Sequence, residues 1–418
     1  MTGFIIAVGS EMLTPFRVDT NSLFITEQLN TIGIDVRMKA VVGDDVAELT
    51  TLVRGALEWA DVIVLTGGLG PTEDDITRDA VARVLGVSMS LNEEVVSRIS
   101  ERFAKRGITM PEINRRQGMV PEGATLIDNP NGTAPGLWIE RGRTLIVMLP
   151  GPPREMKPMF EGVLKDRLTP RSGGRGLFRR VLKITGRTES DVDATAQPVY
   201  GRWLAQAVPI STTILAVLGQ IELHLTASAS SRADADGALD PAVAELQTAL
   251  GEAVYSVDGK GLETVVAELL RAARLTIATA ESCSGGLLAS RLTDVPGSSA
   301  YMQQGVVCYT NASKTQWLGV PAALIEEHGA VSEPVAKAMA AGVRRAAASD
   351  VGVGITGVAG PGGGTPEKPV GTVAIAVSTP LAERVRTFQF FGGRDLVKFQ
   401  SSQAALNMLR LLLCYPRS

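Results

Sequence analysis

Residues 62–79 read Val-Ile-Val-Leu-Thr-Gly-Gly-Leu-Gly-Pro-Thr-Glu-Asp-Asp-Ile-Thr-Arg-Asp. The four leading apolar residues predict a buried strand, and the glycine-rich turn after them predicts the start of a helix. Backbone N–H groups at such a turn commonly bind phosphate. The segment therefore predicts an α/β fold with an anion site at a strand end, although it matches neither a Walker A loop nor G-x-G-x-x-G.

The same alternation of short apolar runs and helical patterns extends through the first 165 residues. It predicts a doubly wound α/β domain with a mainly parallel sheet over residues 1–168. The expected strands are 3–8, 34–41, 61–65 and 144–149, and the expected helices are 20–32, 45–59, 74–86 and 92–106.

Two further regions follow a Gly- and Pro-rich linker at 169–176. Residues 176–256 predict a small α+β module, and residues 260–416 predict a second α/β domain, so three domains are expected. In the module we expect strands 178–185 and 219–227 and helices 188–205 and 238–251. In the last domain we expect helices 262–273, 284–294, 333–348 and 395–413 and strands 275–279, 304–309, 351–355 and 371–378.

Composition excludes several classes of protein. The 418 residues carry 41 basic and 44 acidic side chains, a net charge of −3, which gives no electrostatic case for a nucleic-acid partner. Cys283, Cys308 and Cys414 form no C-x-x-C pair, which argues against a disulfide framework or structural zinc. With no targeting segment or long apolar span recognised, we expect a cytoplasmic protein with no membrane association.

The C-terminal third combines serine, tyrosine and lysine, whereas the whole chain has only two histidines. A hydrolase needs a nucleophile and a base to activate it. With histidine so scarce, a lysine of lowered pKa is the natural base, and Lys314 is the best placed. Taken singly, Ser282 fits a helix cap and Lys314 a solvated lysine. Their combination at successive strand ends predicts a Ser/Lys amidohydrolase.

Six motifs follow one another there: 281–286 (Glu-Ser-Cys-Ser-Gly-Gly), 296–299 (Pro-Gly-Ser-Ser), 309–314 (Tyr-Thr-Asn-Ala-Ser-Lys), 328–332 (His-Gly-Ala-Val-Ser), 355–363 (Ile-Thr-Gly-Val-Ala-Gly-Pro-Gly-Gly) and 368–372 (Lys-Pro-Val-Gly-Thr). This series resembles the nicotinamide-mononucleotide deamidase domain of the CinA (competence/damage-inducible) family over about 262–413. The resemblance implies hydrolysis of the nucleotide's carboxamide to nicotinate mononucleotide and ammonia, without a metal or other cofactor.

The same resemblance implies a role for each matching residue. Ser299 is the expected nucleophile, Lys314 its general base and Tyr309 their support, while spacing alone leaves Ser282 open as the alternative nucleophile. The residues expected to bind the substrate are Ser282, Thr356, Gly360, Gly362, Gly363 and Arg394.

The N-terminal domain resembles the corresponding CinA domain, which is similar in fold to molybdopterin-binding enzymes of the MogA type. Matching segments are 9–13, 19–22, 67–79, 131–136 and 149–156. The resemblance implies a pyrophosphate-binding site and, in some members, ADP-ribose pyrophosphatase activity with a divalent metal such as Mg, Mn or Co. The expected site residues are Gly67, Gly68, Gly70, Thr72, Asp74 and Asp75, and the candidate metal ligands are Asp74 and Asp75, with Glu11 and Asp19 weaker.

Alternatives remain open at this point. Leu69 stands between Gly68 and Gly70 where molybdopterin enzymes usually have threonine, which weakens the case for cofactor adenylation. A molybdopterin-binding enzyme is nevertheless the second hypothesis, and a competence or DNA-damage regulator acting through protein contacts is the third. The middle module resembles the small KH-like domain of CinA proteins but lacks a Gly-x-x-Gly loop, so we expect a spacer or dimer-forming role. The partners expected are nucleotide substrates and a second copy of the chain.

Overall fold

The computed structural model describes residues 1–380 and 382–415, so residues 381 and 416 of the expected C-terminal domain lie outside the described part. Contacts divide the chain into two compact units. The first comprises Met1–Phe178 with Ala227–Gly237, and the second comprises Arg179–Thr226 with Ala238–Ser418. The residues of the expected middle module are divided between these units, with most of them in the second.

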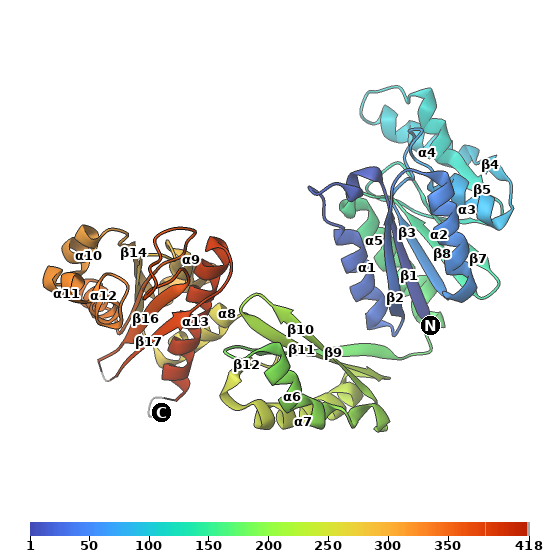
Figure 1. Cartoon of the computed structure of the whole chain (residues 1–418). Helices are drawn as coiled ribbons and strands as arrows, with labels where there is room; N and C mark the ends of the chain where they lie inside the picture. Colours follow the sequence, from blue (N-terminus) through green and yellow to red (C-terminus); the bar gives the residue numbers. More distant parts are fainter. Residues whose placement is uncertain (381, 416–418) are drawn as a thin grey trace. The chain divides into compact units, whose positions relative to one another are not determined.

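The first unit is built on a six-stranded sheet with the order β2-β1-β3-β8-β7-β6 (Figure 1). β2, β1, β3 and β8 pair in parallel, and β7 and β6 add an antiparallel edge. Its strands are β1 Thr2–Val8, β2 Asp35–Val42, β3 Val62–Thr66, β6 Thr125–Ile127, β7 Gly136–Arg141 and β8 Thr144–Leu149. A separate antiparallel pair is formed by β4 Met89–Leu91 and β5 Met119–Pro121.

Helices cover both faces of this sheet, because its central strands are apolar on both sides. α1 (Thr20–Thr31) and α5 (Pro153–Val163) share one core with the sheet. α2 (Val46–Trp59) and α3 (Thr77–Leu85) share the other. The remaining helical segments are α4 Glu93–Ala104, η1 Ser10–Leu13, η2 Glu112–Gly118, η3 Leu164–Leu168 and η4 Thr169–Arg171.

The middle module has a four-stranded sheet with the order β10-β11-β9-β12. Its alternating burial along β11 is typical of a sheet with one covered face. The strands are β9 Gly176–Ile184, β10 Ile210–Val217, β11 Gln220–Ala229 and β12 Val254–Ser256. The helices are α6 Glu189–Tyr200, α7 Arg232–Leu250, η5 Trp203–Ala205 and η6 Gly251–Ala253.

The C-terminal domain is a second α/β sandwich, with the strand order β14-β13-β15-β16-β17 (Figure 1). The first three strands are parallel and the last two antiparallel. The strands are β13 Ile277–Glu281, β14 Met302–Val307, β15 Val351–Gly357, β16 Thr372–Ser378 and β17 Glu383–Gln389.

Helices again cover both faces of this five-stranded sheet. α8, α9 and α13 share the large apolar core on one face, and α10, α11 and α12 contribute to the cores on the other. Their bounds are α8 Leu262–Ala273, α9 Leu287–Thr293, η7 Ser298–Ala300, α10 Asn311–Leu318, α11 Ala322–His328, α12 Glu333–Ala346 and α13 Arg394–Cys414.

The expected fold class is confirmed: two α/β domains with a small α+β module between them in the chain. Within the described residues, no helix combines the length and the apolar character needed to cross a membrane. Each α/β sheet has parallel strands whose carboxyl ends meet at one edge, where ligand clefts of this fold class form.

Candidate functional site

The first candidate site lies at the carboxyl edge of the C-terminal sheet. Ser282 directly follows β13, Thr356 lies near the end of β15, and Tyr309 and Lys314 follow β14. These ends surround a cleft of about 250 Å³. Its walls include Ser282, Tyr309, Lys314, Thr356, Gly360, Gly362, Gly363 and Arg394, together with Cys283, Asn311, Ala330, Val331, Gly357, Val358 and Ala359.

Lys314 is the buried lysine of this cleft. Its Nζ lies 3.2 Å from Ser282 Oγ and donates to the carbonyl oxygens of Cys308 (3.1 Å) and Tyr309 (3.2 Å). Only 1% of the residue is exposed. None of these three partners is a carboxylate, and burial lowers the pKa of Lys314 below its ordinary value, against a smaller opposing effect of Cys308 and Cys283. A lysine in this state can accept a proton from the neighbouring serine.

A buried carboxylate shapes the serine loop. Glu281 is 1% exposed and accepts hydrogen bonds from the backbone N–H groups of Gly286 (3.1 Å), Leu288 (3.1 Å) and Ala289 (2.8 Å). Three N–H groups satisfy the buried charge and hold the turn that follows Ser282 against the start of α9. Sequence reasoning missed this role, although a glutamate ending an otherwise apolar strand was a visible signal.

Tyr309 and Arg394 form one wall of the cleft. Arg394 donates through Nη2 to the Tyr309 hydroxyl (3.1 Å) and through Nη1 to the Gly360 carbonyl (2.9 Å). The hydrogen bond to Tyr309 raises the pKa of Arg394. The arginine thus joins the start of α13 to both the tyrosine and the glycine-rich loop. Thr356, one of the residues expected to bind the substrate, donates its hydroxyl to the Ala330 carbonyl at 2.8 Å.

Ser299 is not among the residues of this cleft. It is exposed in η7, before the first residue of β14, whereas Lys314 follows the last. A six-residue strand spans roughly 20 Å, so the two residues belong to opposite ends of the sheet. Arg271 of α8 holds the turn at 296–299 through a hydrogen bond to the Pro296 carbonyl. The expected pairing of Ser299 with Lys314 is therefore corrected: the serine beside the lysine is Ser282.

The second candidate site lies at the carboxyl edge of the first unit's sheet, where the loop after β3 borders a cleft of about 340 Å³. Gly67 has φ 104°, and a Cβ there would come 2.1 Å from the Val8 carbonyl oxygen, so only glycine fits. Of the residues expected at this site, those that line the cleft are Glu11, Gly67, Gly68, Gly70, Asp74 and Asp75. Thr72 is not part of the lining. An adjoining cleft of about 340 Å³ is lined by Arg17 and Asp19, among others.

Two side chains fix the shape of this glycine loop. Arg78 is 3% exposed and donates to the carbonyl oxygens of Leu69 (2.7 Å) and Gly70 (2.8 Å). Its burial lowers the pKa to about 10. Asp75 accepts from the N–H groups of Gly70 (2.7 Å) and Thr72 (2.8 Å) and from the Thr72 hydroxyl (2.6 Å). Both Asp75 oxygens are therefore already used to hold the loop.

The expected metal ligands are not gathered into one cluster. Asp19 accepts from the Ser22 N–H at 2.9 Å as the N-cap of α1. Within residues 1–380 and 382–415, no three Asp, Glu, His or Cys side chains are grouped so that they could hold a metal ion. The lining of the first cleft nevertheless has five carboxylates and no lysine or arginine: Glu11, Asp44, Asp74, Asp75 and Glu155. Mg²⁺ commonly binds through one or two carboxylates together with substrate phosphates, which suits this lining better than a protein-only cage.

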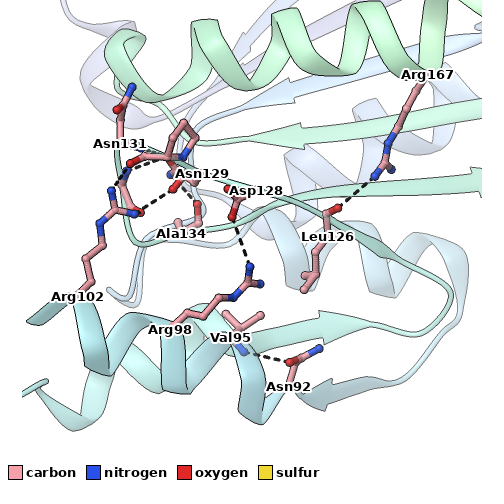
Figure 2. Close-up of polar contacts among 12 residues, drawn as sticks. Asn92, Val95, Arg98, Arg102, Leu126, Asp128, Asn129, Asn131, Ala134 and Arg167 are labelled. Carbon is pink, nitrogen blue, oxygen red and sulfur yellow. Dashed lines mark hydrogen bonds and ion pairs between the residues drawn. The ribbon is translucent and has the colours of Figure 1, made fainter.

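Thr133 and Ala134, which line this cleft, belong to a braced loop at residues 129–134 (Figure 2). Arg102 of α4 donates to the carbonyl oxygens of Asn129 (2.9 Å), Pro130 and Gly132. The Asn129 side chain donates to the Ala134 carbonyl (2.8 Å) and to Glu155 (2.9 Å). The loop is thus held from both sides, which keeps Ala134 and Glu155 in place along the cleft.

Comparison with known protein families identifies all three parts of the chain. The CinA C-terminal domain matches residues 259–413, the probable molybdopterin binding domain matches 4–170, and the damage-inducible protein CinA KH domain matches 179–256. A CinA-like protein of Koribacter versatilis is 46% identical over 414 residues, 98% of this chain and 99% of the relative. A putative competence-damage inducible protein of Caldicellulosiruptor bescii is 40% identical over 410 residues, 98% of each chain.

Solved structures of related proteins cover one part of the chain each. The protein CinA from Thermoplasma acidophilum, whose structure is described as of unknown function, is 34% identical, with a TM-score of 0.38. The match covers 40% of this chain and 98% of that one. A competence/damage inducible protein from Agrobacterium tumefaciens is 37% identical over 37% of this chain and 93% of its own, with a TM-score of 0.36.

Proposed function

Since the chain belongs to the CinA family of competence/damage-inducible proteins, we propose that its C-terminal domain is an amidohydrolase acting on nicotinamide mononucleotide. The products are nicotinate mononucleotide and ammonia. The observation that carries the proposal is the 3.2 Å contact between Lys314 Nζ and Ser282 Oγ at the wall of a cleft. A buried lysine of lowered pKa beside a serine has the chemistry of a base with its nucleophile.

The reaction proceeds in two halves. The neutral Lys314 amine takes the proton from Ser282 Oγ as this oxygen attacks the carboxamide carbon. The resulting ammonium returns the proton to the leaving nitrogen, and ammonia departs to leave an ester on Ser282. Lys314 then takes a proton from water, which attacks the ester carbon, and the nicotinate carboxylate is released as Ser282 Oγ recovers its proton.

Tyr309 and Arg394, which also line the cleft, support this chemistry. Their hydrogen bond fixes the tyrosine beside the base, since Lys314 itself donates to the Tyr309 carbonyl. Two hydrogen bonds hold the Arg394 guanidinium, so its charge stays at the cleft with little loss of entropy on binding.

The test of this function is ammonia release from nicotinamide mononucleotide by the purified full-length protein, with and without EDTA. We expect steady release that EDTA does not change, because the base and the nucleophile are both side chains of this domain. Absence of ammonia under either condition would contradict the proposal, and loss of release with EDTA would contradict the metal-independent mechanism.

The acid-lined cleft of the first unit favours a second activity, hydrolysis of the pyrophosphate of ADP-ribose. Five carboxylates would repel a pyrophosphate unless a divalent cation such as Mg²⁺, Mn²⁺ or Co²⁺ accompanied it. Among the described residues, the Asp74 and Glu11 carboxylates hold no loop or helix cap, whereas Asp75 accepts from two backbone N–H groups and Asp19 from one. The metal would supply charge neutralisation at the phosphates.

Replacing Asp74 with asparagine should lower metal-dependent AMP release from ADP-ribose by about 100-fold or more, since one ligand charge is lost. Release would be measured with each of the three metals and with EDTA. Glu27→Gln, an exposed α1 carboxylate away from the cleft lining, is the matched control. Wild-type release that persists in EDTA, or equal rates in both variants, would contradict the second activity. Retained pterin in the purified protein would favour the molybdopterin alternative.

A further inference from the structure

Lys398 of α13 lies against Gly285, in the loop that follows Ser282, and takes no part in the chemistry above. We propose that its ammonium binds the 5′-phosphate of the substrate, so that the enzyme prefers a nucleotide to the corresponding nucleoside. This inference rests on the proposed deamidase function and assigns the substrate's phosphate to a specific side chain.

The position of Lys398 places a cation against residues 283–286, the nucleophile loop that follows Ser282. Its Nζ lies 3.6 Å, and its Cε 3.7 Å, from the point that a Cβ on Gly285 would occupy. The Gly285 N–H donates to the Ser282 carbonyl at 3.2 Å, so one tight turn separates the two residues. The ends of such a turn lie within about 7 Å of each other. The ammonium is therefore close to the end of the cleft where Ser282 lies.

The donors of Lys398 are unused. The side chain is half-buried, yet it makes no hydrogen bond or ion pair with any residue in the described part of the chain. Asp395, three residues earlier on α13, does not pair with it. Glu281, the carboxylate of the neighbouring loop, already accepts three backbone N–H groups. A lysine ammonium has three donors, and holding it partly out of water without an acceptor is unfavourable unless a ligand anion fills the place.

Arg394 precedes Lys398 by four residues, so the two cations share one face of α13. They differ in what they already bind. Arg394 donates to the Gly360 carbonyl and to the Tyr309 hydroxyl, and it thereby positions the wall of the cleft. Lys398 keeps all its donors for a ligand. A phosphate placed between them would also receive the remaining N–H groups of Arg394.

The other cations near the cleft are committed to different tasks. Lys314 is the buried base, and Lys368 donates to the His328 carbonyl at 2.7 Å. Among these cations, only Lys398 both lies beside the nucleophile loop and has three free donors. The geometry therefore separates the roles of the cations: Lys314 for proton transfer, Arg394 for positioning, and Lys398 for the phosphate.

The experiment compares kcat/KM for nicotinamide mononucleotide and nicotinamide riboside, which differ only in the phosphate. Lys398→Gln should lose about 10- to 100-fold on the mononucleotide, the usual worth of a hydrogen bond to a charged group. On the riboside it should change by less than about twofold. Lys398→Arg should recover most of the loss, and Lys337→Gln, which replaces a half-buried lysine of α12 paired with Glu383, is the charge control.

Equal losses on both substrates, or no loss on either, would overturn the inference, because the phosphate would then not be what Lys398 recognises. Binding separates this result from failure of the proposed function. The affinities of both compounds would be titrated against the Ser282→Ala protein, with and without the additional Lys398→Gln substitution. A phosphate-dependent gain in affinity that needs Lys398 supports the inference even if the wild type releases no ammonia. If the phosphate brings no gain in affinity, or if the gain persists without Lys398, the inference is overturned.

Discussion

Replacing Ser282 with alanine should lower ammonia release from nicotinamide mononucleotide by about 10⁴-fold or more. The variant lacks the only hydroxyl within hydrogen-bonding distance of Lys314 Nζ among the described residues, so no ester can form. Losses of this size accompany removal of a nucleophile from serine hydrolases, where binding alone sustains the residual rate. The measurement is initial ammonia release with saturating substrate, with folding of the variant checked by circular dichroism.

Ser299→Ala is the matched control, because it removes the same hydroxyl from the other candidate serine. Ser299 lies in η7 before β14, away from the cleft lining, so activity should stay within about twofold of wild type. The reverse result, an inactive Ser299→Ala protein with an active Ser282→Ala protein, would overturn the assignment. A further discriminating observation is an ester of nicotinate mononucleotide on a Ser282-containing peptide after rapid acid quench.

Sequence spacing predicted the residue types of the C-terminal site but did not choose between the two serines. Both lie near glycine, since Ser282 precedes Gly285 and Gly286 and Ser299 follows Gly297, and both belong to motifs of the resemblance. The difference lies in strand direction. Ser282 follows the carboxyl end of β13, whereas Ser299 precedes the amino end of β14. Because clefts of parallel α/β sheets form at carboxyl ends, this signal was available once the strand at 304–309 was predicted.

Many helices and strands were predicted near their observed bounds, but α5, β7, β10 and β17 were missed. The strand at 62–65 corresponds to β3, but the helix expected from residue 74 begins at Thr77, because Asp75 and Arg78 hold the preceding residues in a loop. β7 was missed, although Gly142 and Arg143 between two apolar runs are typical of a two-residue hairpin turn. Tertiary pairing, which sequence patterns do not show, stabilises such short strands.

Buried charges were the other feature that sequence patterns hid. Glu281 and Arg78 read as ordinary polar residues, yet each is almost fully buried and holds several backbone groups. Their burial depends on where neighbouring elements pack, which is a property of the fold. The same holds for Lys314: the sequence identified it as the best placed base, whereas its burial against Ser282 required the structure.

Lys314→Met should lower ammonia release by about 10³-fold or more, since the base is lost while the volume of the side chain is kept. Lys314→Arg should be similarly inactive, because arginine retains its proton at all working pH values and cannot act as a base. In the wild type, kcat/KM should rise with pH up to the lowered pKa of Lys314 and level off below the ordinary lysine value, about 10.4. An active Lys314→Arg protein would show that the lysine serves only to orient Ser282.

The same lysine should make the folded state least stable when it is protonated. Its pKa is lower in the folded than in the unfolded protein, so between the two values the unfolded chain binds more protons. Unfolding free energy therefore rises with pH across this window. Lys314→Met also removes the hydrogen bonds to Cys308 and Tyr309. Their loss changes the stability of the variant but adds little pH dependence. As pH rises towards about 10, the free energy of unfolding of the wild type, measured with urea, should thus increase relative to that of Lys314→Met. Lys337→Met is the control. If the difference in free energy of unfolding between the two proteins did not change with pH, Lys314 would not have the lowered pKa on which its role as a base depends.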